Sequence, residues 1–156
     1  MIEIVRCTPD DYQQIIAEIV EFWGSERTLS LHHPLFVHEL GDTAFCCRDG
    51  SLVAAYLFGL IAQTTPTAYV HLVGVRATYR KRGLARQLYQ RFSVIARTRG
   101  CTALKAITTP GNSDSIAFHR ALGMALPGEP NADGIPVVAD YAGPGQDRVI
   151  FHCALV

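Results

Sequence analysis

The stretch Arg80-Lys81-Arg82-Gly83-Leu84-Ala85 carries the residue types best suited to binding an anion. It lies between a run typical of a β-strand (Tyr69 to Val75) and a run typical of a helix (Leu84 to about Arg99). A glycine after three cations lets the backbone approach a bulky anion, and the amides that follow are free donors at the positive end of the helix dipole. The P-loop spacing and the three glycines of a dinucleotide fingerprint are both absent. The stretch therefore predicts a site for a phosphate or pyrophosphate.

Charge is unevenly distributed along the chain although the formal net charge is zero. No Asp or Glu occurs between Asp49 and Asp114. That interval holds nine cations: Arg76, Arg80, Lys81, Arg82, Arg86, Arg91, Arg97, Arg99 and Lys105. One basic segment in a neutral chain favours a local anionic ligand over a nucleic-acid groove. On charge alone, a solvated arginine-rich helix face is the alternative.

The cysteines and histidines do not form a metal-site pattern. The five cysteines have no CxxC spacing and are odd in number, which predicts buried reduced thiols. His32, His33 and His38 come nearest to a zinc set, but they lack the spacing and a fourth ligand. No apolar run reaches the roughly 18–20 residues that span a bilayer, and the first residues lack a signal-peptide pattern. We therefore expect a cytoplasmic protein that holds no metal and does not enter the membrane.

The elements that must position the basic loop follow from periodicity and turn residues. With 49% hydrophobic residues, the length of 156 predicts one α/β domain over residues 1–156 in the order β-α-α-β-β-β-α-β-α-β-β. Thr8-Pro9-Asp10-Asp11 predicts a capped helix start, and Asp49-Gly50 predicts a two-residue hairpin turn. The expected strands are 2–6, 43–48, 52–63, 69–75, 102–108, 135–141 and 148–155.

The run from Val73 to Ala85, with the basic loop at its end, resembles the acetyl-CoA signature of the GCN5-related N-acetyltransferase (GNAT) superfamily. That signature is commonly written (Arg or Gln)-x-x-Gly-x-(Gly or Ala). Asn112 through Met124 is similar to the superfamily's helix beside the cofactor thiol, and the element order agrees over nearly the whole chain. The resemblance implies the GNAT fold, with a mixed, mostly antiparallel sheet of about seven strands flanked by about four helices. It also implies direct acetyl transfer from acetyl-CoA to a primary amine in a ternary complex.

The resemblance also implies which residues bind the cofactor. The binding loop is Arg80, Lys81, Arg82, Gly83, Leu84 and Ala85, whose last four amides would cradle the pyrophosphate of coenzyme A. The pantetheine arm would pair with the exposed strand backbone at Val73, Gly74 and Val75, where one amide would donate to the thioester oxygen. Gly74 fits a bulge that splays the neighbouring strands, or else it is a packing glycine. Asn112 and Ser115 would line the slot.

Two histidines are candidate catalytic residues within this resemblance. His71 lies on the strand that meets the cofactor, where some members of the family hold a Glu or His base. A hydrogen-bonded core histidine is the equal alternative. His119 lies where many members have a tyrosine that protonates the departing thiolate. Because Asn112, Ser115 and His119 share one helix face, His119 is a candidate acid, cofactor contact or structural residue.

The acceptor side in this family is built from the first helical region and the last hairpin. Here that implies Trp23, His32, His33, Asp140 and Tyr141. Carboxylates there would attract a cationic amine, although loop acids are more often simply solvated. The expected partner is a small-molecule or peptide amine, and the expected assembly is a monomer or homodimer. A non-catalytic acyl-CoA-binding sensor is the alternative function.

Overall fold

The computed structural model describes residues 1–156 and is built on a six-stranded sheet in the order β1-β2-β3-β4-β5-β8. These strands are β1 (Ile2–Arg6), β2 (Ala44–Asp49), β3 (Leu52–Ile61), β4 (Thr67–Val75), β5 (Ala103–Thr108) and β8 (Val149–Ala154). Only β4 and β5 pair in parallel, so the expected mixed, mostly antiparallel sheet is confirmed. The strand expected at 135–141 is shorter: β7 (Pro136–Val137) pairs with β6 (Glu129–Pro130) outside the main sheet.

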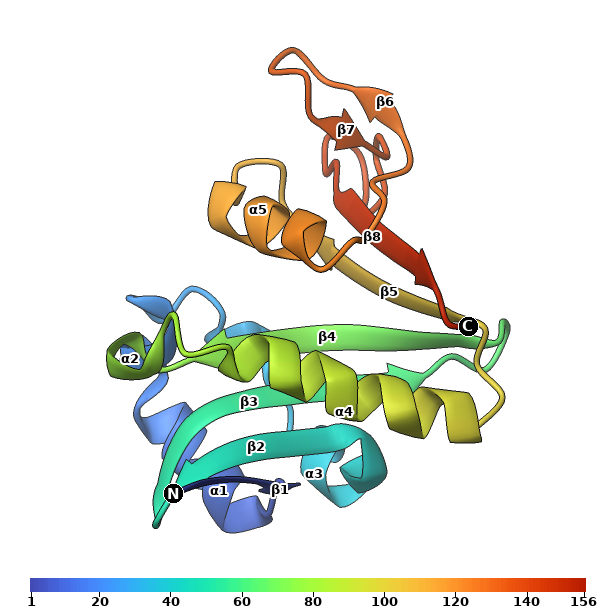
Figure 1. The fold of residues 1–156 in the computed structure, drawn as a ribbon. Helices are drawn as coiled ribbons and strands as arrows, with labels where there is room; N and C mark the ends of the chain where they lie inside the picture. Colours follow the sequence, from blue (N-terminus) through green and yellow to red (C-terminus); the bar gives the residue numbers. More distant parts are fainter.

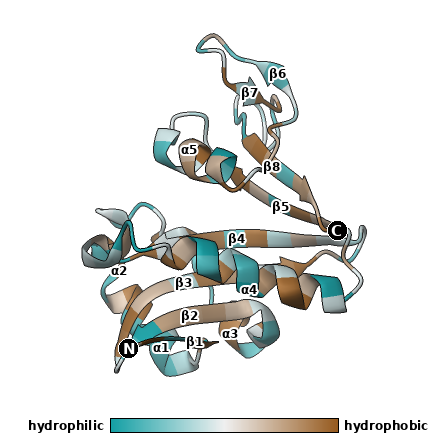
Figure 2. Cartoon of the chain, in the orientation of Figure 1, coloured by the Kyte–Doolittle hydropathy of each residue, from teal (hydrophilic) through white to brown (hydrophobic).

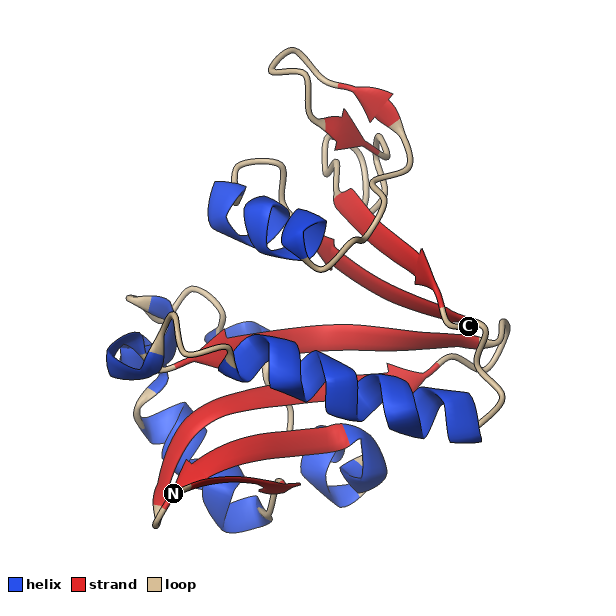
Figure 3. Ribbon diagram, viewed as in Figure 1, coloured by secondary structure: helices blue, strands red, loops and turns tan.

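The helices cover the two faces of the sheet unequally (Figure 1, Figure 3). They are α1 (Pro9–Ala17), α2 (Ile19–Trp23), α3 (Leu35–His38), α4 (Leu84–Thr98) and α5 (Ser113–Ala121). One core cluster joins α4 to one face of the sheet, with Leu88 and Phe92 fully buried. A second cluster packs α1, α2 and α3 on the opposite face through Ile15, Phe22 and Phe36. None of the five helices is both long and apolar enough to cross a membrane.

Local signals account for how these elements begin and end. Thr8 caps α1: its hydroxyl accepts the Asp11 N–H at 3.2 Å while the Asp11 carboxylate accepts the Thr8 N–H at 2.7 Å. The predicted helix start is thus confirmed. The hairpin between β2 and β3 lies one residue later than expected. Asp49 pairs with Leu52, so Gly50 and Ser51 form the two-residue loop, with Gly50 at φ 62°.

Hydropathy follows this layering. The strands are predominantly apolar in Figure 2, and α4 alternates between apolar and polar sides along its length. The side of α4 that meets the sheet carries Leu84, Leu88, Tyr89 and Phe92, all buried and spaced as on one face of a helix. The helix is thereby held rigidly across the sheet, and its first turn is presented at the end of β4.

Candidate functional site

A wedge between β4 and β5 is the main irregularity of the sheet. The two strands pair only from Thr67–Val70 to Ala103–Ala106. Beyond that point β4 continues to Val75 beside β3, while the last residues of β5 pair only with β8. Figure 1 shows the two strands diverging as a V that opens towards the first turns of α4 and α5. The end of β4 therefore has one free edge inside the sheet.

The register of β3 against β4 shows which backbone groups this free edge offers. Val70 lies opposite Gly59 and Leu72 lies opposite Phe58, so His71 is the extra residue of a β-bulge. The Arg76 N–H donates to Ala54 at 2.9 Å and thus points towards β3.

Peptide groups alternate in direction along a strand. Because the pairing is unbroken from Leu72 to Val75, the Gly74 N–H also points towards β3, whereas those of Val73 and Val75 point into the wedge. Of the three residues expected to expose their backbone, Val73 and Val75 therefore do so, whereas Gly74 faces β3.

Gly74 itself has a different function from the bulge that its sequence context suggests. It pairs regularly with Tyr56, and a Cβ at this position would lie only 2.8 Å from the Tyr56 ring. Of the two alternatives for Gly74, the packing glycine is therefore confirmed and the bulge is wrong. The bulge lies three residues earlier, at His71, opposite Gly59.

The basic loop leads into the uncapped N-terminus of α4. Gly83 is the N-cap in the left-handed conformation, with φ 76°, and no side chain caps the helix. The amides of Gly83, Leu84 and Ala85 have no hydrogen-bond partner in the protein. A Cβ at Gly83 would meet no atom within 4 Å, so the space in front of these amides is open. Free donors, the dipole of a 15-residue helix and open space together form an arrangement that suits an anion.

The cations of this loop are anchored to the backbone around it. Arg80 donates to the carbonyl of Phe22 at 2.8 Å, and Arg82 donates to that of Thr78 at 3.2 Å while lying over the Tyr79 ring. Lys81 has a positive φ of 62°. Since no carboxylate pairs with these three side chains, their charge is left for a ligand.

His71 lies at the bulge, on the face opposite α4. Its Nε2 lies 2.9 Å from the Leu31 carbonyl, and its ring stacks on Phe36 with 4.9 Å between ring centroids. Since a carbonyl can only accept, Nε2 carries the proton and a neutral ring keeps its lone pair on Nδ1. The ring is thus held in one orientation with one basic nitrogen available.

His32 and Trp23 belong to a buried polar chain beneath β4. The Trp23 indole donates to the Tyr56 hydroxyl at 2.7 Å, and that hydroxyl lies 2.6 Å from Nε2 of His32. The other nitrogen of His32 donates to the Thr28 carbonyl at 2.8 Å. Burial lowers the pKa of His32, which keeps it neutral as an acceptor for Tyr56. His33, in contrast, is exposed and accepts only the Leu35 N–H.

His119 is enclosed and fully hydrogen-bonded. Its Nδ1 donates to the Ser115 carbonyl at 2.7 Å, and its Nε2 lies 2.6 Å from the Tyr89 hydroxyl. The ring stacks on Phe151 at a centroid distance of 4.0 Å, and the side chain is only 4% exposed. Burial lowers its pKa to about 4. A neutral His119 with both nitrogens engaged has no free N–H to offer a thiolate.

Asn112 and Ser115 lie at the start of α5, as expected. The Asn112 side chain caps the helix by accepting the Ser115 N–H at 3.2 Å. Its amide donates to the Thr108 hydroxyl at the end of β5, at 3.1 Å. The Ser115 hydroxyl lies 3.3 Å from His119. These contacts fix α5 on the β5 side of the wedge.

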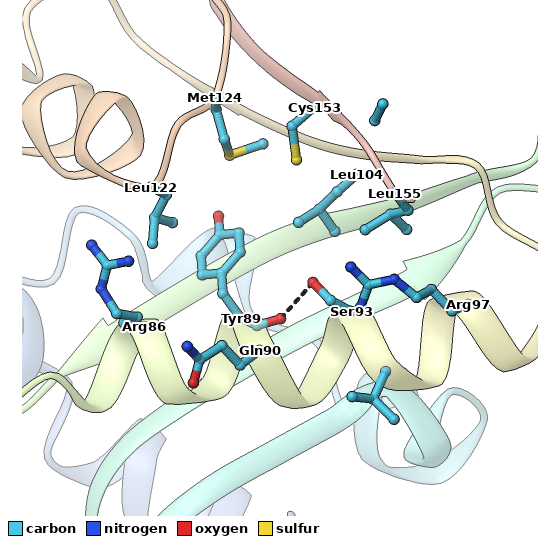
Figure 4. Close-up of a pocket in the computed structure, with 12 residues that line it drawn as sticks. Arg86, Tyr89, Gln90, Ser93, Arg97, Leu104, Leu122, Met124, Cys153 and Leu155 are labelled. Carbon is cyan, nitrogen blue, oxygen red and sulfur yellow. Dashed lines mark hydrogen bonds between the residues drawn. The ribbon is translucent and has the colours of Figure 1, made fainter.

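A cavity of about 390 Å³ lies behind the wedge, between α4 and the layer of β5 and β8. Figure 4 shows Tyr89 standing from α4 into this space, with Leu122 and Arg86 at one end. Arg86 also donates to the Ala121 carbonyl at 3.2 Å and so joins α4 to the end of α5. No residue of the basic loop before α4 and none of β4 lines the cavity.

The last loop contributes Tyr141 to the face that carries His71. The Tyr141 hydroxyl accepts a hydrogen bond from Lys105 at 2.8 Å. Lys105 lies beside Tyr69 in the β4–β5 register, and the rings of Tyr69 and His71 are 6.1 Å apart. The Asp140 carboxylate instead accepts the Gly145 N–H within its own loop. Sequence reasoning missed Lys105, although a lone cation in an otherwise apolar strand was a visible signal.

One potential ligand cluster lies elsewhere. Ligand atoms of Cys7, Asp11 and Cys46 lie within 4.8 Å of one another in the core. The Asp11 carboxylate is occupied by Arg48 and Thr8, and the cluster is one ligand short of a tetrahedral zinc site. A hydrogen bond with Cys46 and burial both raise the pKa of the Cys7 thiol. All five cysteines are free thiols.

Comparisons with known proteins agree with this geometry. Residues 5–124 match the model of the Acetyltransferase (GNAT) family. Over 101 residues the chain is 27% identical to aminoglycoside N(6')-acetyltransferase type 1 of Salmonella typhimurium, covering 65% of this chain and 68% of the relative.

Among solved structures, a GNAT-family protein described as an acetyltransferase from Desulfovibrio desulfuricans aligns with a TM-score of 0.77 at 16% identity, covering 100% of both chains. The PaiA N-acetyltransferase of Thermoplasma acidophilum, solved with coenzyme A, aligns with a TM-score of 0.71 at 15% identity, covering 99% of each chain. A family match over most of its length, together with the wedge and the open helix N-terminus, shows that this chain belongs to the GNAT family of acetyltransferases.

Proposed function

We propose that this protein is an N-acetyltransferase that moves the acetyl group of acetyl-CoA directly to a primary amine. Acetyl-CoA is the cosubstrate of the family and supplies an acetyl group activated as a thioester. The observation that carries the proposal is the continuity of two features. The free backbone edge at Val73 and Val75 is followed, after the 3-10 turn Ala77–Tyr79 and the basic loop, by the open, uncapped N-terminus of α4.

These residues fit the chemical parts of coenzyme A. The amides of Gly83, Leu84 and Ala85 suit a pyrophosphate, as does the charge of the three cations before them. The unpaired N–H groups of Val73 and Val75 suit the amides of a pantetheine arm lying along the wedge, while the Val75 carbonyl accepts a hydrogen bond from Arg80 at 3.4 Å. An N–H of this edge can also donate to the thioester oxygen, where negative charge develops during transfer.

His71 is the proposed general base. The Leu31 carbonyl and the Phe36 ring hold it at the bulge, two residues before the Val73 edge, with Nδ1 free to accept a proton. The amine nitrogen bonds to the acetyl carbon, and one amine proton passes to His71. The carbon–sulfur bond then breaks, and the sulfur leaves as the thiolate of coenzyme A, which takes up a proton from water. Holding both reactants in one wedge supplies much of the rate enhancement.

His119 is better suited to positioning than to proton donation. Its two hydrogen bonds tie Tyr89 of α4 to the backbone of α5 at distances of 2.6 and 2.7 Å. The elements on the two sides of the wedge are thus joined through one ring. We infer that His119 sets the width of the cofactor slot.

The test combines binding with turnover. Calorimetry should detect acetyl-CoA binding, and a thiol reagent should detect coenzyme A released in the presence of an amine panel of amino acids, peptides, polyamines and aminoglycosides. Thiol release that depends on the amine supports the transferase. Tight binding without release from any amine would support an acyl-CoA sensor. Absence of binding would contradict both functions.

A further inference from the structure

We propose that the amine acceptor also carries a carboxylate, which Lys105 binds beside Tyr141. This inference rests on the proposed transferase function and specifies the class of its acceptor. It predicts a subsite for an anionic group on the face of β5 that is turned away from α4.

The position of Lys105 follows from the alternation along β5. Leu104 and Ala106 are buried in the cluster beneath α4, so Lys105 between them projects from the opposite face. The helices α1, α2 and α3 cover that face only over β1 to β4, because their core cluster contains no residue of β5 or β8. Lys105 therefore stands on a part of the sheet that these helices leave open, half-exposed between Tyr69 of β4 and His152 of β8.

The ammonium group of Lys105 is held in place without being neutralised. It donates to the Tyr141 hydroxyl at 2.8 Å and lies 5.1 Å from the centroid of that ring. No carboxylate lies within salt-bridge distance of it.

The two acids nearest in the loop face their own backbone. Asp140 accepts the Gly145 N–H at 2.7 Å, and Asp147 accepts the Asp140 N–H at 2.9 Å. Lys105 is thus a positioned cation that no carboxylate of the protein neutralises.

Lys105 also lies at a useful distance from the proposed base. Tyr69 is its direct neighbour across the strands, and His71 is two residues further along β4. Strand spacing and rise place the Cα atoms of His71 and Lys105 roughly 8 Å apart. One acceptor molecule can therefore present its amine at His71 and the wedge while its carboxylate reaches Lys105. Amino acids with the two groups a few bonds apart fit this span.

A polycationic acceptor fits this face less well. It would meet Lys105 with no carboxylate to offset the repulsion, and like charges brought together at a binding site are disfavoured. The curated relative is named for an aminoglycoside, which is polycationic, and it shares only 27% identity with this chain. Polycationic acceptors such as aminoglycosides are therefore expected to be poor substrates of this protein.

The experiment compares acceptors that differ only in the anionic group. Glycine, β-alanine, γ-aminobutyrate and 5-aminovalerate are each paired with their carboxamide, and acetyl-CoA-dependent thiol release gives kcat/KM. Spermidine and kanamycin serve as polycations. For at least one pair, the wild-type protein should prefer the carboxylate by about tenfold or more, the scale of a charge-assisted hydrogen bond.

Variants then test whether Lys105 causes the preference for the carboxylate over the carboxamide. Lys105→Met keeps the aliphatic stem and should bring the carboxylate/carboxamide ratio close to one while turnover of the carboxamide persists. Lys105→Arg should retain most of the preference, and Tyr141→Phe should reduce it in part. Arg99→Gln is the matched control, because it removes one cation that is paired with Asp42 at the far end of α4. The ratio should not change in this control.

The possible outcomes distinguish failure of the carboxylate subsite from failure of the proposed transferase function. If acetyl-CoA does not bind, the transferase proposal itself fails. If thiol is released, three results would show that the carboxylate subsite is wrong. The carboxylate/carboxamide ratio of kcat/KM could be near one in the wild type, or it could be unchanged in Lys105→Met. The kcat/KM of kanamycin or spermidine could also exceed that of the carboxylates.

If acetyl-CoA binds without turnover of any amine, the subsite is tested by binding instead. Calorimetry then measures the affinity of N-acetyl-β-alanine and N-acetyl-γ-aminobutyrate for the coenzyme A complex. Equal affinities in the wild type and Lys105→Met, or no binding to either, would also overturn the subsite.

Discussion

His71 and His119 show how hydrogen-bond partners give the same side chain different chemistry. Each has one nitrogen fixed by a backbone carbonyl, that of Leu31 or of Ser115. The second nitrogen of His119 is occupied by Tyr89, whereas no partner within the protein occupies that of His71. A proton acceptor needs such a free nitrogen, so the basic function is expected at His71 and a structural function at His119.

The function of His71 predicts a pH-dependent loss of activity. His71→Ala should lower turnover at neutral pH by about 10²-fold, the scale of lost general-base catalysis. Part of the loss should be recovered at high pH, where the amine deprotonates unaided. His38→Ala, which removes an exposed histidine from the same region, is the control and should behave as wild type. If the pH–rate profile of His71→Ala has the wild-type shape, His71 is a packing residue.

The burial of His119 predicts acid sensitivity of the fold. Its pKa is about 4 in the folded protein and near 6.5 when unfolded, so the contribution of the neutral ring is complete above pH 6.5 and is lost as pH falls towards 4. This amounts to about 2 kcal/mol between pH 7 and pH 5, since one pKa unit is worth about 1.4 kcal/mol.

His119→Phe should therefore have a flatter dependence of unfolding free energy on pH, as measured by urea titration at several pH values. The variant also leaves the buried Tyr89 hydroxyl without a partner, which lowers stability at every pH by about 1–3 kcal/mol. The slope of unfolding free energy against pH is therefore more informative than the stability at any one pH. His32 titrates in the same direction and contributes to both proteins. Equal slopes would show that His119 does not control acid stability.

At the scale of single elements, the two ends of α4 provide a matched pair of glycines. Gly83 and Gly100 flank the helix, both have φ 76°, and neither has an atom within 4 Å of an added Cβ. Gly83→Val and Gly100→Val should each cost about 1–2 kcal/mol through left-handed strain. Only Gly83→Val places a side chain before the free amides, so it alone should abolish acetyl-CoA binding in calorimetry. Normal binding by a folded Gly83→Val protein would move the anion site elsewhere.

Elements were largely predictable where their causes are local. The capped start at Thr8, the helix from Leu84 and the helix that follows Asn112 each depend on neighbouring residues, and each is confirmed. What could not be predicted depends on residues distant in sequence. Gly74 is required by the Tyr56 ring across the strand, and the position of the bulge depends on the β3–β4 register. The hydrogen bonds from Tyr89 to His119 and from Lys105 to Tyr141 likewise join residues 30 and 36 positions apart.

At the scale of the whole molecule, the sheet consists of two parts joined only by the short parallel pairing of β4 with β5. The part from β1 to β4 carries four of the helices, while β5, β8 and α5 diverge from it beyond the pairing of Val70 with Ala106 (Figure 1). Polar contacts across the wedge include Arg86 with Ala121 and Tyr89 with His119. One apolar cluster also packs residues of both parts together, such as Leu88 and Phe151. A ligand lying in the wedge would supply the backbone partners that β5 does not give to β4.

This arrangement predicts an alternating pattern of amide hydrogen exchange along one strand. In the free protein the amides of Val73 and Val75 should exchange rapidly because they point into the wedge, while the amide of Gly74 should exchange slowly because it points towards β3. Saturating coenzyme A should slow Val73 and Val75 by at least about tenfold, since opening the bound state must also release ligand.

Gly74 is the internal control, because its partner in β3 is present in both states. Exchange measured residue by residue by NMR would resolve the three neighbours. If coenzyme A protects the amides of Gly83 to Ala85 but leaves Val73 and Val75 unchanged, the pyrophosphate site stands and the pantetheine arm does not pair with β4. Equal protection of all three β4 amides would indicate general stabilisation of the sheet. Only selective protection of the alternate residues demonstrates a ligand hydrogen-bonded along the free edge.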